Sequence, residues 1–257
     1  MNRIFLILFP FLFICNHGYT QSKLEKAKKS LKVNNQPIPD DDSYILLDAF
    51  GFISSLFPDG SSNDTDYVSH KKVTKYPYFK STKPGNYVYF APDTITKNFR
   101  VEILNRFIFE NPKLYGNHLN IGVRSADGFG LEIDYLQLWE NNTNFGYNSL
   151  AITTGLLKYY WIHEERFDTW IGLGANFLED NISDWGLSAG IGAEYFFIQP
   201  MSFETNLYWS FNGGTIQSYS TGLNYHYKRY IFSGGYEFLK IGDPDFSMFS
   251  VGVGVSF

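Results

Sequence analysis

The sequence has a single cysteine, and charged residues make up only 18% of it. One cysteine cannot build an intrachain disulfide framework or a cysteine-based zinc site. The 21 basic residues are outnumbered by 26 acidic ones, giving a net charge of −5, which disfavours a nucleic-acid-binding surface. After residue 20, no apolar run approaches the roughly 18 residues that a membrane-spanning helix requires. The composition therefore excludes a helical membrane protein and a disulfide-stapled domain.

Aromatic residues are abundant, at 19% of the chain, and there are 23 glycines. So many aromatic side chains are not typical of a disordered chain, and so few charges are not typical of a coiled coil. The length of 257 residues suits one large domain or two small ones.

The first twenty residues have the pattern of a secretory signal peptide. Arg3 precedes an apolar run from Ile4 to Cys15, and a small and polar stretch follows up to Thr20. We expect export with cleavage near Thr20. Lipid attachment at Cys15 is disfavoured because Ile14, rather than a small residue, precedes it. An exported chain without a helical span is either a soluble domain or a membrane barrel.

The C-terminal segment alternates bulky apolar residues with mostly small ones. Such alternation places the two sets on opposite faces of a β-strand. The bulky set is Phe249, Val251, Val253, Val255 and Phe257, and the other set is Met248, Ser250, Gly252, Gly254 and Ser256.

Several upstream segments repeat this alternation, but their second face carries ionisable groups. A dry protein core would not tolerate these charges, whereas the lumen of a membrane barrel can supply water and counter-charges. The charged residues predicted to face the lumen are Arg100, Glu102, Arg106, Arg124, Glu132, Asp134, Glu194, Glu204 and Glu237. The alternative is a secreted β-sandwich with half-buried strands.

The alternation predicts an antiparallel barrel over residues 98–257 with about ten strands, and eight or twelve remain possible. An even number is typical of single-chain bacterial barrels. The predicted strands are Phe99 to Phe109, His118 to Arg124, Phe129 to Trp139, Tyr147 to Tyr160, Phe167 to Phe177, Trp185 to Phe197, Ser202 to Phe211, Ser218 to Tyr227, Tyr230 to Lys240 and Ser247 to Phe257.

The final strand, with its terminal aromatic residue, resembles the C-terminal assembly signal of Gram-negative outer-membrane β-barrel proteins. The resemblance implies a location in outer-membrane lipid, insertion by the barrel-assembly machinery, and Phe257 as the docking residue. No active site of a particular subfamily maps onto this sequence, and we expect no cofactor. With Phe257 at the periplasmic end, the loop at Asn111 to Asn117 faces outward and the turn at Ala126 to Gly128 faces the periplasm.

Residues 21–97 form an N-terminal extension that we expect on the periplasmic side. Lys23 to Lys32 is a basic stretch with marginal helical character. Residues 43–57 predict a helix, with Ser43 as N-cap and Pro58 as stop, and this helix is apolar on nearly every side. It is expected to pack on or partly plug the barrel, and the alternatives are a helix that docks an envelope protein partner or one that lies on the membrane surface. Residues 61–97 predict an irregular segment on the barrel rim.

Candidate chemistry is sparse. The lumen charges are expected to form a structural ion-pair network, and the alternative is a narrow polar conduit or ligand pocket whose carboxylates favour cations. No spacing predicts a metal site. The histidines after the predicted signal peptide are His70, His118, His163 and His226. A hydrolase would have to use His226, with Ser218 and Ser220 on the same strand face, but no orienting carboxylate is evident from the spacing.

The sequence thus favours a non-enzymatic outer-membrane barrel with a structural or accessory role, possible membership of a larger membrane complex, and no nucleic-acid partner. A narrow channel or small-ligand binder is the alternative, and an outer-membrane hydrolase is the second alternative.

Overall fold

The computed structural model describes residues 22–33, 71–79, 85–89, 96–142, 146–164, 166–179, 184–211 and 214–257. The predicted signal peptide and the predicted helix at 43–57 lie outside these ranges and stay predictions. Among the described residues, no helix is both long enough and apolar enough to cross a membrane.

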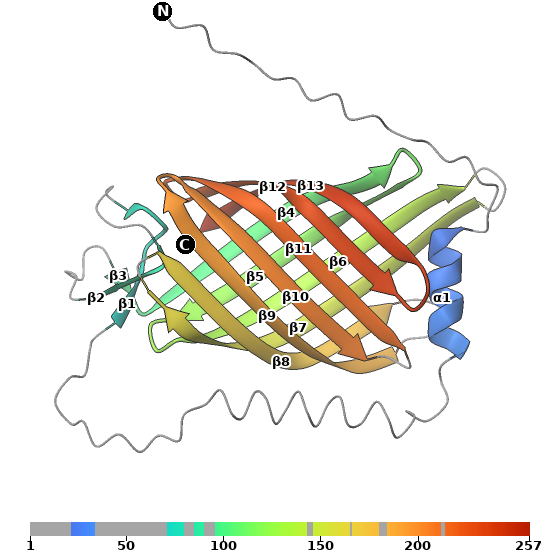
Figure 1. The fold of residues 1–257 in the computed structure, drawn as a ribbon, viewed down its shortest axis with the longest axis horizontal. Coiled ribbons are helices and arrows are strands. Elements are labelled where there is room, and N and C mark those ends of the chain that lie inside the picture. The colour runs from blue at the N-terminus through green and yellow to red at the C-terminus, as the bar shows by residue number, and fades with distance from the viewer. Residues whose placement is uncertain are drawn as a thin grey trace, which may run out of the picture.

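A closed antiparallel barrel of ten strands dominates the structure (Figure 1), as the alternation predicts. The last strand pairs with the first, so Val251 lies opposite Phe107 and the sheet has no free edge. The strands are β4 (Phe99–Asn111), β5 (Leu114–Ser125), β6 (Phe129–Asn142), β7 (Gly146–His163), β8 (Phe167–Glu179), β9 (Asp184–Ile198), β10 (Met201–Phe211), β11 (Thr215–Tyr227), β12 (Tyr230–Ile241) and β13 (Asp245–Ser256).

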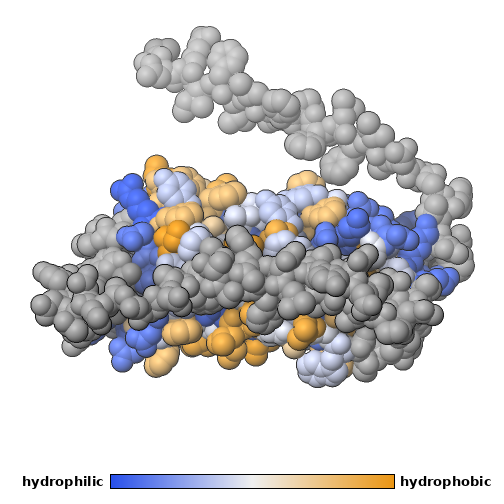
Figure 2. Space-filling view, turned by 60° about the horizontal axis from the view of Figure 1, so that its bottom comes forward, coloured by the Kyte–Doolittle hydropathy of each residue, from blue (hydrophilic) through white to orange (hydrophobic). Residues whose placement is uncertain are grey.

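Alternate side chains point outward and inward along each strand, because successive residues of a strand face opposite sides of the sheet. The outward set is bulky and apolar, as at Leu131, Leu187 and Val253, which are all more than half exposed. Figure 2 shows apolar side chains along the middle of the visible barrel wall and hydrophilic ones toward its two ends.

The inward set forms two layers. One end of the lumen is filled by aliphatic side chains, and the remainder is lined by polar and charged ones. This aliphatic layer corrects the expectation of a lumen face that is polar along its whole length. Its members on the barrel strands are Ile108, Leu114, Leu136, Leu138, Leu150, Ile152, Leu178, Ile216, Leu239, Ile241, Phe246 and Met248.

Helix α1 (Lys23–Val33) closes the mouth next to the aliphatic layer. Ser22 is its N-cap, accepting a hydrogen bond from the backbone N–H of Glu25, in the S-x-x-E pattern of a capping box. The Glu140 carboxylate accepts from the first backbone N–H groups, those of Lys23 at 3.1 Å and Leu24 at 2.9 Å. The Leu24 side chain is fully buried in the aliphatic layer. This tertiary contact explains why a stretch with marginal intrinsic helicity is helical.

The position of α1 corrects one expectation. We predict the whole extension on the side of Phe257, but α1 lies at the opposite end of the barrel from the C-terminus (Figure 1).

A small antiparallel sheet lies at the C-terminal end of the barrel (Figure 1), and we name it the cap sheet. It consists of β1 (Lys71–Thr74), β2 (Tyr87–Tyr89) and β3 (Thr96–Lys97), in the order β2-β1-β3. The sequence predicts an irregular segment on the barrel rim here. The observed location at the rim agrees with this prediction, but the three short strands were not predicted. Thr74 and Asn86 hold the sheet together through backbone and hydroxyl hydrogen bonds.

Candidate functional site

The polar part of the lumen is the candidate site, and the structure places all nine predicted lumen residues at inward-facing positions. Five of them are buried, namely Arg100, Arg106, Arg124, Glu132 and Glu237. The other four, Glu102, Asp134, Glu194 and Glu204, are half-buried. Because neighbouring strands are paired in register, most of these side chains meet partners from other strands, whereas Arg100 and Glu102 pair along β4.

One cluster lies next to the aliphatic layer and is built around Glu237. Its carboxylate pairs with Arg106 Nε at 2.9 Å and with His118 Nδ1 at 2.6 Å. His118 Nε2 lies 2.7 Å from Asp134 Oδ2, so the imidazole bridges two carboxylates from β6 and β12. Such buried charges are tolerated only when they are paired and hydrogen-bonded.

A second cluster involves β6, β7, β8 and β10. Lys158 pairs with the Glu132 carboxylate, and Tyr208 donates its hydroxyl to the same carboxylate at 3.1 Å. The Lys158 ammonium lies 3.5 Å from the ring centre of Trp170, a cation–π contact in a desolvated setting. Glycines opposite the indole leave room for it: a Cβ at Gly192 would lie 2.5 Å from the Trp170 ring.

A third cluster joins the barrel to the cap sheet. Arg124 donates to Asp168 Oδ2 at 2.8 Å and stacks on Tyr160 with its guanidinium carbon 4.1 Å from the ring centre. Asn86, directly before β2 of the cap sheet, donates to Asp168 Oδ2 at 2.6 Å and to Glu194 Oε2 at 2.9 Å. The polar side chain of Asn86 thus reaches into the lumen.

Arg100, on the first barrel strand β4, also binds the cap sheet to the barrel. It is fully buried, and it donates to the Thr74 carbonyl at 3.3 Å and to the Asn86 amide oxygen. It also pairs with Glu102 at 3.3 Å. The cap sheet is therefore held by a buried guanidinium and an amide instead of an apolar interface alone.

Two buried tyrosines, Tyr78 after β1 and Tyr87 in β2, also pack at the end of the barrel that the cap sheet closes. Burial raises the pKa of Tyr78 to about 12, with a further rise from Glu194 and an opposing effect of Arg166. Burial likewise raises the pKa of Tyr87 to about 12 against the lowering effect of Arg124. Both phenols stay protonated at physiological pH, and Tyr78 donates to the Met201 carbonyl at 2.6 Å.

A serine, a histidine and a carboxylate do converge in the lumen, although not the ones singled out from sequence. Ser202 Oγ lies 2.8 Å from both His226 Nε2 and Glu194 Oε1, whereas neither Ser218 nor Ser220 forms a hydrogen bond with His226. In a hydrolytic triad the carboxylate orients the far nitrogen of the histidine. Here the serine sits between the two groups, and His226 Nδ1 has no partner among the described residues. The ring is buried beneath Tyr78.

The remaining histidines add no site. His163 lies at the end of β7 beside the Tyr87 ring, with ring centres 5.0 Å apart, and His70 lies outside the described residues. Within the described ranges, no group of three or more His, Cys, Asp or Glu side chains has an arrangement suited to a metal ion.

Sequence reasoning missed the partners His118, Lys158, Asp168 and Asn86. Each could be found only by knowing the register, because a residue that neutralises Glu132 or Arg124 sits on another strand. The alternation of β5 and β7 was the available signal: it puts His118 and Lys158 on inward positions.

The outside of the barrel defines the class. Large apolar side chains are exposed around it, as at Phe107 on β4, Leu157 on β7, Phe203 on β10 and Phe232 on β12. Only a closed barrel satisfies all strand hydrogen bonds without a free edge, and only hydrocarbon suits such an apolar exterior around a charged interior. The chain is an outer-membrane β-barrel.

Comparison with known proteins gives similarities to solved structures. No protein-family model matches the chain, and no curated protein matches it. Similar solved structures include the Yersinia pestis outer membrane protein Ail in a phospholipid bilayer nanodisc, with 14% identity and a TM-score of 0.37, covering 62% of this chain and 99% of that chain. OprG from Pseudomonas aeruginosa has 15% identity and a TM-score of 0.31, covering 62% and 95%. Neisserial surface protein A has 13% identity and a TM-score of 0.32, covering 63% and 98%. These are likenesses of fold alone.

Proposed function

We propose that this protein is a closed, non-enzymatic outer-membrane barrel with a structural or accessory role in the cell envelope. One observation supports it above others: the described parts of the chain close both ends of the barrel. Helix α1 and the aliphatic layer occupy one mouth, and the cap sheet, held by Arg100 and Asn86, occupies the other.

The aliphatic layer is the stronger barrier to conduction. Leu138, Leu239 and Phe246 are at most 2% exposed, and Leu24 of α1 packs against the same cluster. A small barrel is filled by its own side chains, and an ion crossing an aliphatic layer would lose its hydration without new ligands. Placing Phe257 at the periplasmic end puts α1 at the outer mouth.

Planar-bilayer recording tests the closure. The refolded full chain is expected to give a flat trace in KCl and CaCl₂ over a wide range of voltages. A variant lacking residues 22–33 is expected to stay closed to steady current, because the strand side chains of the aliphatic layer remain. Stepwise conductance from the full chain would contradict the proposal.

An envelope partner is part of the proposal and rests on the apolar sequence at 43–57 alone. A variant lacking residues 43–57 keeps α1 and the cap sheet, so it separates docking from closure. Crosslinking in native membranes should yield a defined partner with the full chain and lose it with the deletion. Recovery of the same lone monomer from both strains would contradict a partner role.

Ser202 lies between His226 and Glu194, whereas in a hydrolytic triad the histidine lies between the serine and the carboxylate. This arrangement supports a role without catalysis. Variants Ser202→Ala and His226→Ala should leave any weak lipid or peptide hydrolysis of the purified protein unchanged. Loss of a reproducible activity in both variants would instead favour the hydrolase.

The ligand-binding alternative has an observation of its own. A chamber of about 80 Å³ lies in the polar part of the lumen, lined by Glu102, Arg124, Glu132, Lys158 and Glu194, among others. Its size suits a few waters or an ion rather than an organic molecule.

A further inference from the structure

The carboxylates of the polar lumen are unequally neutralised. Three of the carboxylates that line the chamber have a cationic partner: Arg124 pairs with Asp168, Lys158 with Glu132 and Arg100 with Glu102. Glu194 and Glu204 are different. Within the described part of the chain, neither pairs with a lysine or an arginine, and the nearest basic group to Glu194 is the His226 imidazole at 3.9 Å.

These two glutamates are neighbours. Glu194 on β9 and Glu204 on β10 are directly opposite each other in the strand register, and both point into the chamber. The β-carbons of such a pair lie about 5 Å apart, close enough for the two carboxylates to converge on one ion. Like charges placed directly opposite are destabilising unless something neutralises them.

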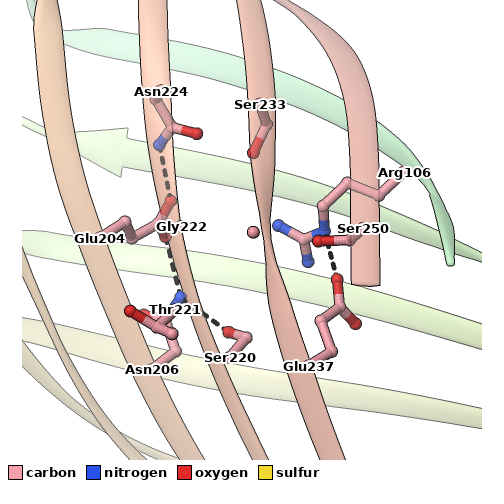
Figure 3. A pocket seen from close by; sticks show the side chains of 11 residues that line it. Arg106, Glu204, Asn206, Ser220, Thr221, Gly222, Asn224, Ser233, Glu237 and Ser250 are labelled. Carbon is pink, nitrogen blue, oxygen red and sulfur yellow. Dashed lines mark hydrogen bonds and ion pairs between the residues drawn. The ribbon is translucent and has the colours of Figure 1, made fainter. Parts of the chain in front are cut away.

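Neutral donors hold both carboxylates in place without removing their charge. Glu204 accepts from Asn206 Nδ2 at 2.9 Å and Asn224 Nδ2 at 3.0 Å, and Figure 3 shows these amides on either side of it. Glu194 accepts from Ser202 Oγ at 2.8 Å and Asn86 Nδ2 at 2.9 Å. Each carboxylate oxygen offers two lone pairs, so each keeps one for a further ligand.

Two other atoms on the chamber wall point independently to a ligand. Asp168 is 1% exposed and His226 is 5% exposed, and both line the chamber. Among the described residues, Asp168 Oδ1 and His226 Nδ1 have no hydrogen-bond partner. A buried acceptor of this kind costs free energy unless water or an ion satisfies it.

We propose that Glu194 and Glu204 bind a hard divalent cation in this chamber, with Ca²⁺ as its probe. Carboxylate oxygens are the ligands such cations prefer, and Ca²⁺ accepts irregular oxygen geometry. Since the described ranges hold no cluster of three or more His, Cys, Asp or Glu side chains placed to ligate a metal, the ion keeps part of its hydration shell. The 80 Å³ of the chamber has room for an ion and several waters, and Asp168 Oδ1 accepts from one of them. The proposal goes beyond the accessory role and does not depend on it.

The test uses the full chain, refolded in detergent without lipopolysaccharide so that lipid phosphates contribute no binding. Because the cap sheet closes the chamber, refolding is carried out with radioactive Ca²⁺, and uptake is then measured by equilibrium dialysis. The wild type should retain about one Ca²⁺ per chain, and the double variant E194Q/E204Q should bind about tenfold more weakly or worse. E179Q, which alters an exposed glutamate at the end of β8, should behave as the wild type.

A second readout is the thermal midpoint. Ca²⁺ should raise it in the wild type and in E179Q and leave it unchanged in E194Q/E204Q, since a ligand stabilises only the state that binds it. If the double variant lacks the gel mobility of a folded barrel, Glu204→Gln alone takes its place. Equal Ca²⁺ uptake by the wild type and the glutamine variant, or none by either, would overturn the proposal and leave a shared proton as the neutralising species.

Discussion

Asn86 Nδ2 lies 2.6 Å from Asp168 Oδ2, and this hydrogen bond joins the cap sheet to the barrel wall. Arg124 donates to the same carboxylate oxygen, so Asp168 links a barrel arginine with a cap amide. The cap sheet and the ion pairs of the lumen therefore share Asp168. A substitution at Asn86 or at Arg124 is therefore expected to weaken the hydrogen bonding of the same carboxylate.

Replacing Asn86 with Ala should loosen the cap sheet. The substitution removes donors to Asp168 and Glu194 and an acceptor of Arg100, leaving buried charges under-satisfied at a cost of roughly 2 to 3 kcal/mol. We expect faster amide hydrogen exchange and faster proteolysis within residues 71–89, while the barrel strands stay protected. Asn98→Ala, at an exposed position next to β4, is the matched control. Equal protection in both variants would show that the amide does not hold the cap.

Replacing Glu237 with Gln should destabilise the barrel itself. The Arg106 guanidinium would stay buried without the carboxylate that it shares with His118. Breaking a buried pair from one side costs roughly 3 to 5 kcal/mol. Urea unfolding in lipid vesicles, followed by tryptophan fluorescence, measures the loss. The exposed control Glu179→Gln should shift the midpoint little, and a similarly small shift for Glu237→Gln would contradict the pairing.

The sequence alone predicts the strands well, because lipid outside and water or charge inside impose opposite chemistry on alternate residues. That is why all ten predicted strands appear, with ends that differ by a few residues. Asn105 breaks the pattern of β4, and the structure puts it on the outer face as an isolated polar side chain. Strand β7 alternates poorly because its inward Leu150, Ile152 and Leu156 belong to an apolar interior.

What the sequence does not predict is the arrangement across the lumen. An aliphatic layer inside a barrel looks the same, residue by residue, as an aliphatic exterior, so Ile108 and Leu138 give no signal of their own. Pairings such as Lys158 with Glu132 depend on register between strands. The position of α1 depends on Glu140, which lies far away in the sequence and binds the start of the helix.

Glycine at position 192 should be required for the lumen packing. A Cβ there would lie 2.3 Å from Asn206 Oδ1 and 2.5 Å from the Trp170 ring. Gly192→Ala should therefore cost roughly 1 to 3 kcal/mol through overpacking. Gly122 offers the matched control, since a Cβ at that inward position meets nothing within 4 Å. We expect a lower unfolding midpoint for Gly192→Ala only. Equal midpoints for the two variants would show that the indole and the amide move aside freely.

Cysteine labelling should report which end of the barrel faces outward. The sole cysteine lies at position 15, within the predicted signal peptide, so a single introduced thiol can be labelled without background after cleavage. Lys29 on α1 and Arg229 in the turn between β11 and β12 are both exposed, at opposite ends of the barrel. A membrane-impermeant maleimide should label Lys29→Cys on intact cells, and Arg229→Cys only after the outer membrane is permeabilised. The reverse pattern would invert the orientation and place α1 in the periplasm.

Phe257 should matter for assembly more than for stability. Its backbone N–H donates to the Val101 carbonyl at 2.8 Å, which any residue could do, whereas its ring is 48% exposed. Phe257→Ala should therefore leave the unfolding midpoint of the refolded protein within about 0.5 kcal/mol of the wild type. In cells the same variant should reduce the amount of folded barrel in the outer membrane several-fold, because the assembly machinery would lose its docking residue.

Phe99→Ala is the control for that experiment. Phe99 is 62% exposed at the same end of the barrel, on β4, so its removal deletes a comparable apolar surface without touching the C-terminal strand. Normal membrane levels of Phe99→Ala beside reduced levels of Phe257→Ala would assign the effect to recognition of the terminal residue. Equal levels of the two variants would mean that Phe257 contributes only as one more lipid-facing ring, since both changes remove the same contact with hydrocarbon.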